Sequence, residues 1–161
     1  MQVEKQLSVL LVNRPGVLAA VCRDLSEHRI NIEAVTIANL VDHAVVRMVV
    51  SDPRAAVHLL EERGVLVIVS DVLAIDLPDR PGAIEALAER LGRADVNIDY
   101  MYGSSRGSRA GRPTIFVRVA DIRGAKRALA RWTSSTVGRR TRPAPPRRAR
   151  PVGHRRATKP R

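Results

Sequence analysis

A short motif occurs twice in this 161-residue chain and constrains its fold more than any other feature. The first copy is Asn13-Arg14-Pro15-Gly16-Val17-Leu18, and the second, 66 positions later, is Asp79-Arg80-Pro81-Gly82-Ala83-Ile84. In both places an apolar run precedes Pro-Gly and a helical pattern follows it, which is typical of a strand-to-helix turn. Each copy is followed by an Asn-Ile pair, Asn31-Ile32 and Asn97-Ile98. The matched spacing predicts a duplicated domain.

The first copy predicts the element order β-α-β-β-α-β. Proline at the first helical position favours a helix starting at Pro15, and a second helix should begin near Asp52-Pro53 and stop at Gly64. The first helix would present one apolar face, formed by Leu18, Val21, Cys22 and Leu25. Apolar and β-branched runs predict strands at 7–12, 32–38, 44–50 and 65–69.

The second copy predicts the same order until its last element. Strands are expected at 72–77, 97–102 and 114–119, and Ile84, Leu87, Ala88 and Leu91 repeat the apolar helical face. A last helix should end near Trp132. There the repeat fails, because the chain offers Thr133-Ser134-Ser135-Thr136-Val137 and then a Pro/Arg-rich run. Either 133–137 forms a poor edge strand or the second sheet lacks a strand.

The net charge of +12 belongs to the end of the chain. Residues 138–161 hold ten of the 28 Lys and Arg residues and no acid, so the remainder carries 18 basic against 16 acidic residues. Such a segment cannot bury enough apolar surface to offset the entropy lost on ordering. We therefore expect a first domain at 1–70, a second at 71–137 and a disordered basic tail at 138–161.

Composition narrows the class of protein. One cysteine allows no intramolecular disulfide, the first seven residues do not resemble a signal peptide, and the longest apolar run is too short to span a membrane. A cytoplasmic protein is expected. His28, His43, His58 and His154 lack metal-ligand spacing, and the chain carries no Ser/His/Asp, Cys/His or phosphate-loop signature. We expect a non-enzyme without a metal or cofactor.

The repeated unit predicts an α+β protein made of two ferredoxin-like βαββαβ domains, each with two helices on one face of an antiparallel sheet. The duplicated Pro-Gly motifs with their Asn-Ile pairs resemble the ACT domain, a regulatory module that binds amino acids. The resemblance covers about residues 6–129. The chain also resembles the small stand-alone tandem-ACT proteins, and Tyr100-Met101-Tyr102 after Asn97-Ile98 is part of that resemblance. The resemblance implies a regulatory protein that binds an amino acid. Such a protein would form a homodimer and act on a regulated enzyme.

In ACT domains the ligand usually lies where the first strand-to-helix loop of one domain faces the second strand of a partner. Carried over to this sequence, the resemblance implies the site residues Asn13, Pro15, Gly16, Val17, Leu18, Asn31, Ile32, Asp79, Pro81, Gly82, Ala83, Ile84, Asn97 and Ile98.

The chemistry of these residues supports two unlike sites. A helix N-terminus supplies unpaired N–H groups and a partial positive charge, both of which suit a carboxylate. Gly16 and Gly82 permit unusual backbone angles and close approach of a ligand. Asn13 can donate and accept hydrogen bonds, whereas an ionised Asp79 can only accept. The Asn13 loop should suit a carboxylate, and the Asp79 loop an ammonium group or no ligand.

Simpler interpretations stay open. Both Pro-Gly pairs could only start helices, Asn31 and Asn97 could only form turns, and Tyr100 and Tyr102 could pack rather than stack on a ligand. The alternative function is a nucleic-acid-associated protein acting through the arginines of the tail. The tail could also be a solvated extension or the product of an altered reading frame.

Overall fold

The computed structural model describes residues 1–104, 113–130 and 132, and it has the expected α+β architecture. Its ten elements, in chain order, are β1 Gln2–Val12, α1 Val17–Glu27, β2 Ile32–Leu40, β3 His43–Val50, α2 Pro53–Glu62, β4 Val67–Asp76, α3 Ala83–Arg93, β5 Ile98–Ser104, β6 Thr114–Val119 and α4 Ile122–Leu129. The segment 133–137 and the tail lie outside the described residues, as does most of the loop between β5 and β6.

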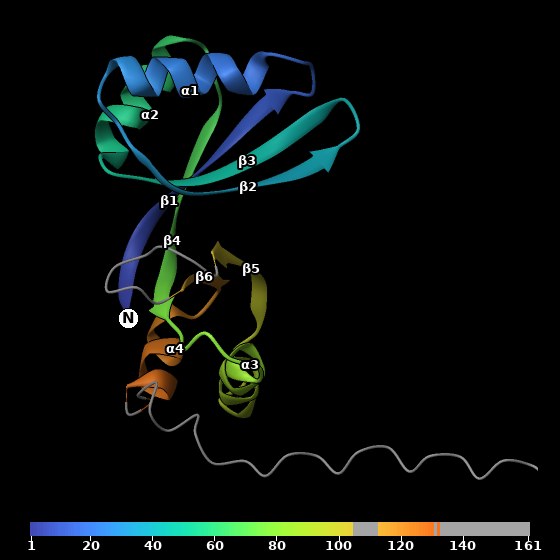
Figure 1. Cartoon of the computed structure of the whole chain (residues 1–161), viewed down its shortest axis with the longest axis vertical. Coiled ribbons are helices and arrows are strands. Elements are labelled where there is room, and N and C mark those ends of the chain that lie inside the picture. Colours follow the sequence, from blue (N-terminus) through green and yellow to red (C-terminus); the bar gives the residue numbers. More distant parts are fainter. Residues whose placement is uncertain (105–112, 131, 133–161) are drawn as a thin grey trace, which may run out of the picture.

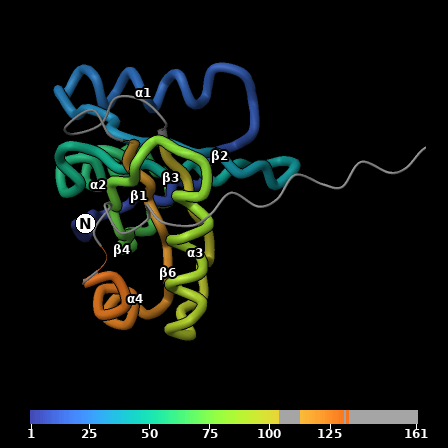
Figure 2. The backbone as a smooth tube through the Cα atoms, turned by 60° about the horizontal axis from the view of Figure 1, so that its bottom comes forward, coloured from blue at the N-terminus to red at the C-terminus, as the bar shows by residue number. Residues whose placement is uncertain are grey.

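All six strands join in one antiparallel sheet with the order β2-β3-β1-β4-β6-β5. The two central strands, β1 and β4, run through the narrow middle of the molecule (Figure 1). Helices α1 and α2 lie at one end and α3 and α4 at the other, and the second view shows the same separation (Figure 2). The molecule is therefore two ferredoxin-like halves built on one continuous sheet.

The central strands each serve both halves, which corrects the expected strand limits. Residues 67–76 form one strand instead of the two expected at 65–69 and 72–77, and β1 starts at Gln2 instead of Leu7. The C-terminal part of β1 pairs with β3, while Gln2–Lys5 pair with Asp71–Ala74 of β4. The start of β1 thus lies beside β4, where the second half would otherwise need its fourth strand. The expected domain boundary after residue 70 falls inside β4.

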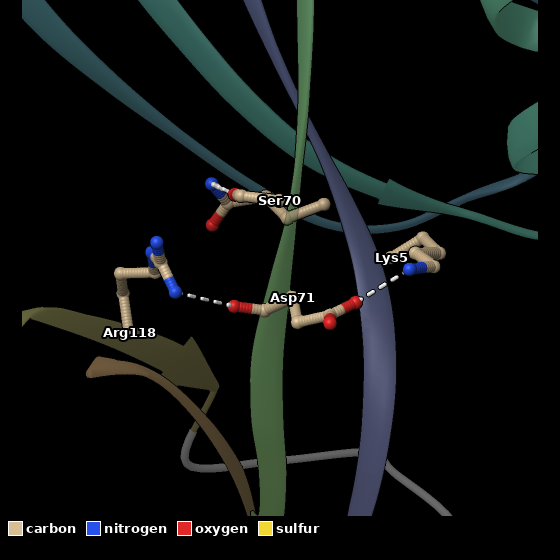
Figure 3. Close-up of polar contacts among 5 residues, drawn as sticks. Lys5, Ser70, Asp71 and Arg118 are labelled. Carbon is tan, nitrogen blue, oxygen red and sulfur yellow. Dashed lines mark hydrogen bonds and ion pairs between the residues drawn. The ribbon is translucent and has the colours of Figure 1, made fainter. Parts of the chain in front are cut away.

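A charged pair at the centre explains why the strands continue through polar residues. Lys5 lies opposite Asp71, its counterpart 66 positions later, so the approximate two-fold axis between the halves passes through this pair. Lys5 Nζ lies 2.7 Å from Asp71 Oδ1. Arg118 Nη1 of β6 donates to the main-chain oxygen of Asp71 at 3.2 Å (Figure 3). The polar residues Ser70-Asp71, which interrupt the apolar run, therefore lie within β4, at the place where the two halves join.

Each half has its own core between the helices and one face of the sheet. On β1 the alternating residues Leu7, Val9 and Leu11 are buried in the first core. Their counterparts on β4, which are Leu73, Ile75 and Leu77, are buried in the second core. This period-two pattern, repeated after 66 residues, is what aligns the halves on a common sheet.

A third, smaller core lies on the helix-free face, where the halves meet. Val49, Val72 and Phe116 form it, one from each of three strands. The edge strands β2 and β5 also contact each other, so the sheet curves around this cluster. The helix-free face is therefore partly enclosed where the two halves face each other.

One fully buried polar residue, Gln6, joins the halves beside this cluster. Gln6 Nε2 donates to Tyr100 Oη at 2.6 Å, and Tyr102 Oη donates to Gln6 Oε1 at 3.0 Å. The Arg47 guanidinium lies 4.3 Å from the centre of the Tyr100 ring. Burial raises the pKa of Tyr102, the neighbouring Tyr100 adds to this rise, and Arg47 opposes it. Both tyrosines therefore take part in packing between the halves.

Within the described residues, no helix has the length and apolar character needed to cross a membrane.

Candidate functional site

The two Pro-Gly loops have the same backbone structure. Gly16 and Gly82 adopt left-handed angles, with φ of 88° and 84°. In the first loop Val17 N donates to Arg14 O at 3.3 Å, and in the second Ala83 N donates to Arg80 O at the same distance. A positive φ is unfavourable for residues with a Cβ. Glycine at both positions therefore fixes how the chain enters α1 and α3.

The helices that follow these loops differ from the other two helices in their capping. Asp52 and Asp121 cap α2 and α4, accepting hydrogen bonds from Ala55 N at 3.1 Å and Gly124 N at 2.8 Å. For α1 and α3 no side chain among the described residues makes such a bond. Beyond Val17 N and Ala83 N, which bond to the preceding loops, the first-turn amides of α1 and α3 thus keep their hydrogen-bonding capacity at the positive end of the helix dipole.

Space lies in front of both glycines, which are exposed. A Cβ placed on Gly16 would meet no described atom within 4 Å, whereas one on Gly82 would lie 3.6 Å from Glu85 Oε2. Glu85 is in the first turn of α3, and its counterpart in α1 is Ala19. The first turn of α1 therefore contains no acidic side chain, and that of α3 has a carboxylate beside its glycine.

Asn13 and Asp79 also give the loops different surroundings. Asn13 Nδ2 donates to Asn39 Oδ1 and to Val41 O, each at 3.1 Å. Its amide group thus holds the β2–β3 turn, in which Val41 has an unusual φ of 70°. Asp79 is exposed at the equivalent place. The side-chain N–H groups of Asn13 are thus used in hydrogen bonds to the β2–β3 turn, and the main-chain amides at the start of α1 remain as donors beside the open space.

The other loop residues of the expected site divide between core and surface. Val17 and Leu18 pack against the first core and Ala83 is buried in the second. Ile84 is half exposed, and Pro15 and Pro81 are exposed.

The Asn-Ile pairs lie at the opposite end of each half from the loops. Val12, just before the first loop, pairs with His43, whereas Ile32 pairs with Val50 at the other end of β3. Asn31 N donates to Ser51 Oγ and Ser51 N donates to Asn31 O, both at 2.9 Å, which joins the residue before β2 to the residue after β3. In the second half, Ile98 likewise pairs with Val119 at the C-terminal end of β6, and Asn97 Nδ2 reaches Asp99 Oδ1 at 3.4 Å. A half does not bring its own loop and Asn-Ile pair together.

A cavity of about 600 Å³ opens on the helix-free side and includes Asn31 and Ile32 among its lining residues. The start of β1, the start of β2, the end of β4 and the facing ends of β5 and β6 surround it. Residues of both halves meet there, at positions more than 60 apart in sequence. No local pattern in the sequence marks such a site, since it depends on the curvature of the sheet. The described residues contain no group of three or more His, Cys, Asp or Glu side chains placed to hold a metal ion.

Comparisons with known proteins agree with this architecture. A family model described as an ACT domain pair matches residues 1–127. The crystal structure of protein BT0572 from Bacteroides thetaiotaomicron is similar at 31% identity and a TM-score of 0.73, over 80% of this chain and 87% of that one. The ligand-free regulatory subunit of aspartate kinase from Thermus thermophilus shares the fold at 16% identity and a TM-score of 0.59, over 81% of this chain and 96% of that one. The regulatory subunit of aspartate kinase from Thermus flavus shares the fold at 14% identity and a TM-score of 0.56, over 80% of this chain and 92% of that one. A comparison with curated proteins gives no match.

Proposed function

The chain belongs to the family of ACT domain pairs, and we propose that it is a non-catalytic regulatory sensor that binds a free amino acid. One observation carries this proposal. The α1 helix begins at an exposed left-handed glycine with no side-chain cap and with open space in front of it, whereas α2, in the same half, is capped by its own Asp52. An opening of this kind suits a carboxylate, because N–H groups and the helix dipole both favour an anion.

The two openings would differ in what they accept. At α1 the carboxylate of the amino acid would bind the amides of Leu18 and Ala19, since no acid lies in that first turn. At α3 the carboxylates of Asp79 and Glu85 would repel a ligand carboxylate and favour an ammonium group or no ligand. We therefore propose α1 as the main site.

A second copy of the chain would complete the site. The Asn-Ile pair of each half lies at the far end of its own sheet from the loop, so a Pro-Gly loop of a second molecule could approach it. We propose a homodimer in which loop residues 13–18 of one copy approach the Asn-Ile strand of the other. The ligand would then shift an equilibrium between arrangements, provided that its affinity differs between them. A regulated enzyme is the proposed partner that responds to this shift.

Thermal unfolding in the presence of each of the twenty amino acids tests this function. A ligand that binds only the folded protein at 100 times its dissociation constant stabilises it by about 2.7 kcal/mol, a readily measured shift in melting temperature. We expect at least one amino acid to raise the melting temperature. No shift with any of the twenty would contradict the proposal.

Matched variants locate the binding site. Ala19→Glu gives α1 the acid that α3 has at position 85, so it should abolish the shift. Ala55→Glu places the same charge at the third position of α2, which Asp52 caps, and should leave the shift unchanged. If both variants keep the shift, the ligand binds elsewhere.

A further inference from the structure

The cavity on the helix-free face has a floor made of aromatic and small side chains. The Tyr102 and Phe116 rings stack there, with their centres 5.4 Å apart and their planes 19° apart. Ala34 of β2 and Ala74 of β4 also line it, and both belong to the small third core. Because two alanines occupy these positions, the facing strands leave space beside the rings. The volume of about 600 Å³ is within the range of small-molecule sites.

Acidic side chains outnumber positive groups among the described residues around this space. Glu4, Glu33 and Asp76 line the cavity with no Lys, Arg or His side chain, and Met1 brings one positive α-amino group to it. Asp76 Oδ1 accepts a hydrogen bond from Thr114 Oγ1 at 2.6 Å, which holds that carboxylate at the edge of the opening. Glu33 is exposed at the start of β2. Ionised carboxylates only accept hydrogen bonds, so a ligand group that binds beside Glu33 or Asp76 would have to be a donor.

Apolar floor and acidic rim together define a class of ligand. A positive group is attracted by the carboxylates and also by the face of an aromatic ring, while an apolar body gains from burial against Tyr102 and Phe116. We propose that this cavity binds a small organic cation, an amine or guanidinium attached to an apolar body. The α1 opening, which would hold a carboxylate, does not line the cavity, although Asn31 and Ile32 of the strand proposed to face that opening in a second copy do.

The experiment compares three probes of similar size by calorimetry on the full chain: phenethylamine, neutral 2-phenylethanol and anionic 3-phenylpropionate. The amine should bind at least tenfold more tightly than the alcohol, the acid should not bind, and added salt should weaken only the amine. Equal affinity for the amine and the alcohol would overturn the proposal.

Two sets of variants assign the binding to the cavity. Glu33→Gln with Asp76→Asn should lower the affinity for the amine about tenfold and leave that for the alcohol unchanged. Ala34→Leu fills the cavity and should abolish binding of both probes. Ala38→Leu is its control, because Ala38 is a half-buried residue of the same strand outside the cavity. Amine affinity that is unchanged in the double variant would contradict the assignment, even if Ala34→Leu fails to fold.

The two ligand sites can be separated in the same preparations. Ala19→Glu should retain phenethylamine binding, and the Glu33→Gln, Asp76→Asn double variant should retain the thermal shift with the amino acid. Loss of amine binding in Ala19→Glu would show that the amine uses the α1 opening and would overturn the proposal for the cavity. If no amino acid changes the melting temperature but phenethylamine still binds, the proposed sensor function is contradicted and the proposal for the cavity is not.

Discussion

The two halves of the molecule are alike where each helix begins and in how each sheet is completed, but they differ in where the completing strand lies along the chain. Gly16 and Gly82 have nearly the same backbone angles, and Asp52 and Asp121 cap corresponding helices. The fourth strand of the first half is the opening part of β4, which follows α2 in the chain, whereas the strand that flanks β4 in the second half is the start of β1, which precedes the first half's other elements. Local features were thus preserved by duplication, whereas sheet completion depends on pairing between the halves. Each half is therefore incomplete without the other.

Truncation of a core leucine in either half should have the largest effect on the free energy of unfolding. Leu7 and its counterpart Leu73 are both fully buried, one in each core. Leu7→Ala and Leu73→Ala should each lower the free energy of unfolding by about 3 kcal/mol. Because β1 and β4 pair with each other along both halves, each variant should still unfold in one transition when denaturation is followed by circular dichroism. Two separate transitions would show that the halves fold independently.

Removal of the polar link between the halves should have the next largest effect. Gln6→Leu leaves the partly buried hydroxyl groups of Tyr100 and Tyr102 without their Gln6 partner, which should cost about 2 kcal/mol in chemical denaturation. Adding Tyr100→Phe and Tyr102→Phe to this variant removes those hydroxyls and should restore most of the loss. If the triple variant is no more stable than Gln6→Leu, lost packing rather than the unpaired hydroxyls sets the cost.

Alkaline pH should weaken the second half through Tyr102, whose counterpart in the first half is Thr36. Burial raises the pKa of Tyr102 in the folded state, so above the ordinary tyrosine pKa of about 10 the unfolded state binds fewer protons. Stability should then fall by up to about 1.4 kcal/mol per pH unit as pH rises. Denaturation at pH 9 and pH 10.5 measures this fall, and Tyr102→Phe should reduce it. An equal fall in that variant would assign the effect to other groups.

The smallest effects concern the C-terminal ends of α1 and α3. Arg29 and its counterpart Asp95 have φ of 57° and 55°, a conformation that favours glycine. Arg29→Gly should stabilise the protein by about 0.5–1 kcal/mol, and Asp95→Gly by less, because aspartate tolerates this conformation better. Melting temperatures compare the two. A larger rise in melting temperature for Asp95→Gly than for Arg29→Gly would contradict this prediction.

Much of the fold followed from residues close together in sequence. The strand at 114–119 has the expected limits, α2 begins after the Asp52 cap, and the Pro-Gly turns lead into helices. The pairing of Gln2–Lys5 with β4 was not predicted, because its signal is Lys5 opposite Asp71, a contact between distant residues. For the same reason the cavity was missed, apart from Asn31 and Ile32, since it exists only where the curved sheet brings β2 and β5 together. Whether the expected site residues bind a ligand stays a prediction.

An amide NMR titration with the amino acid that gives the largest thermal shift tests the proposed sensor most directly. The account predicts that the main-chain amides of Leu18 and Ala19 shift the most, while those of Arg54 and Ala55, in the capped first turn of α2, stay in place. Shifts confined to other parts of the chain, with Leu18 and Ala19 unmoved at saturation, would contradict binding at the α1 opening.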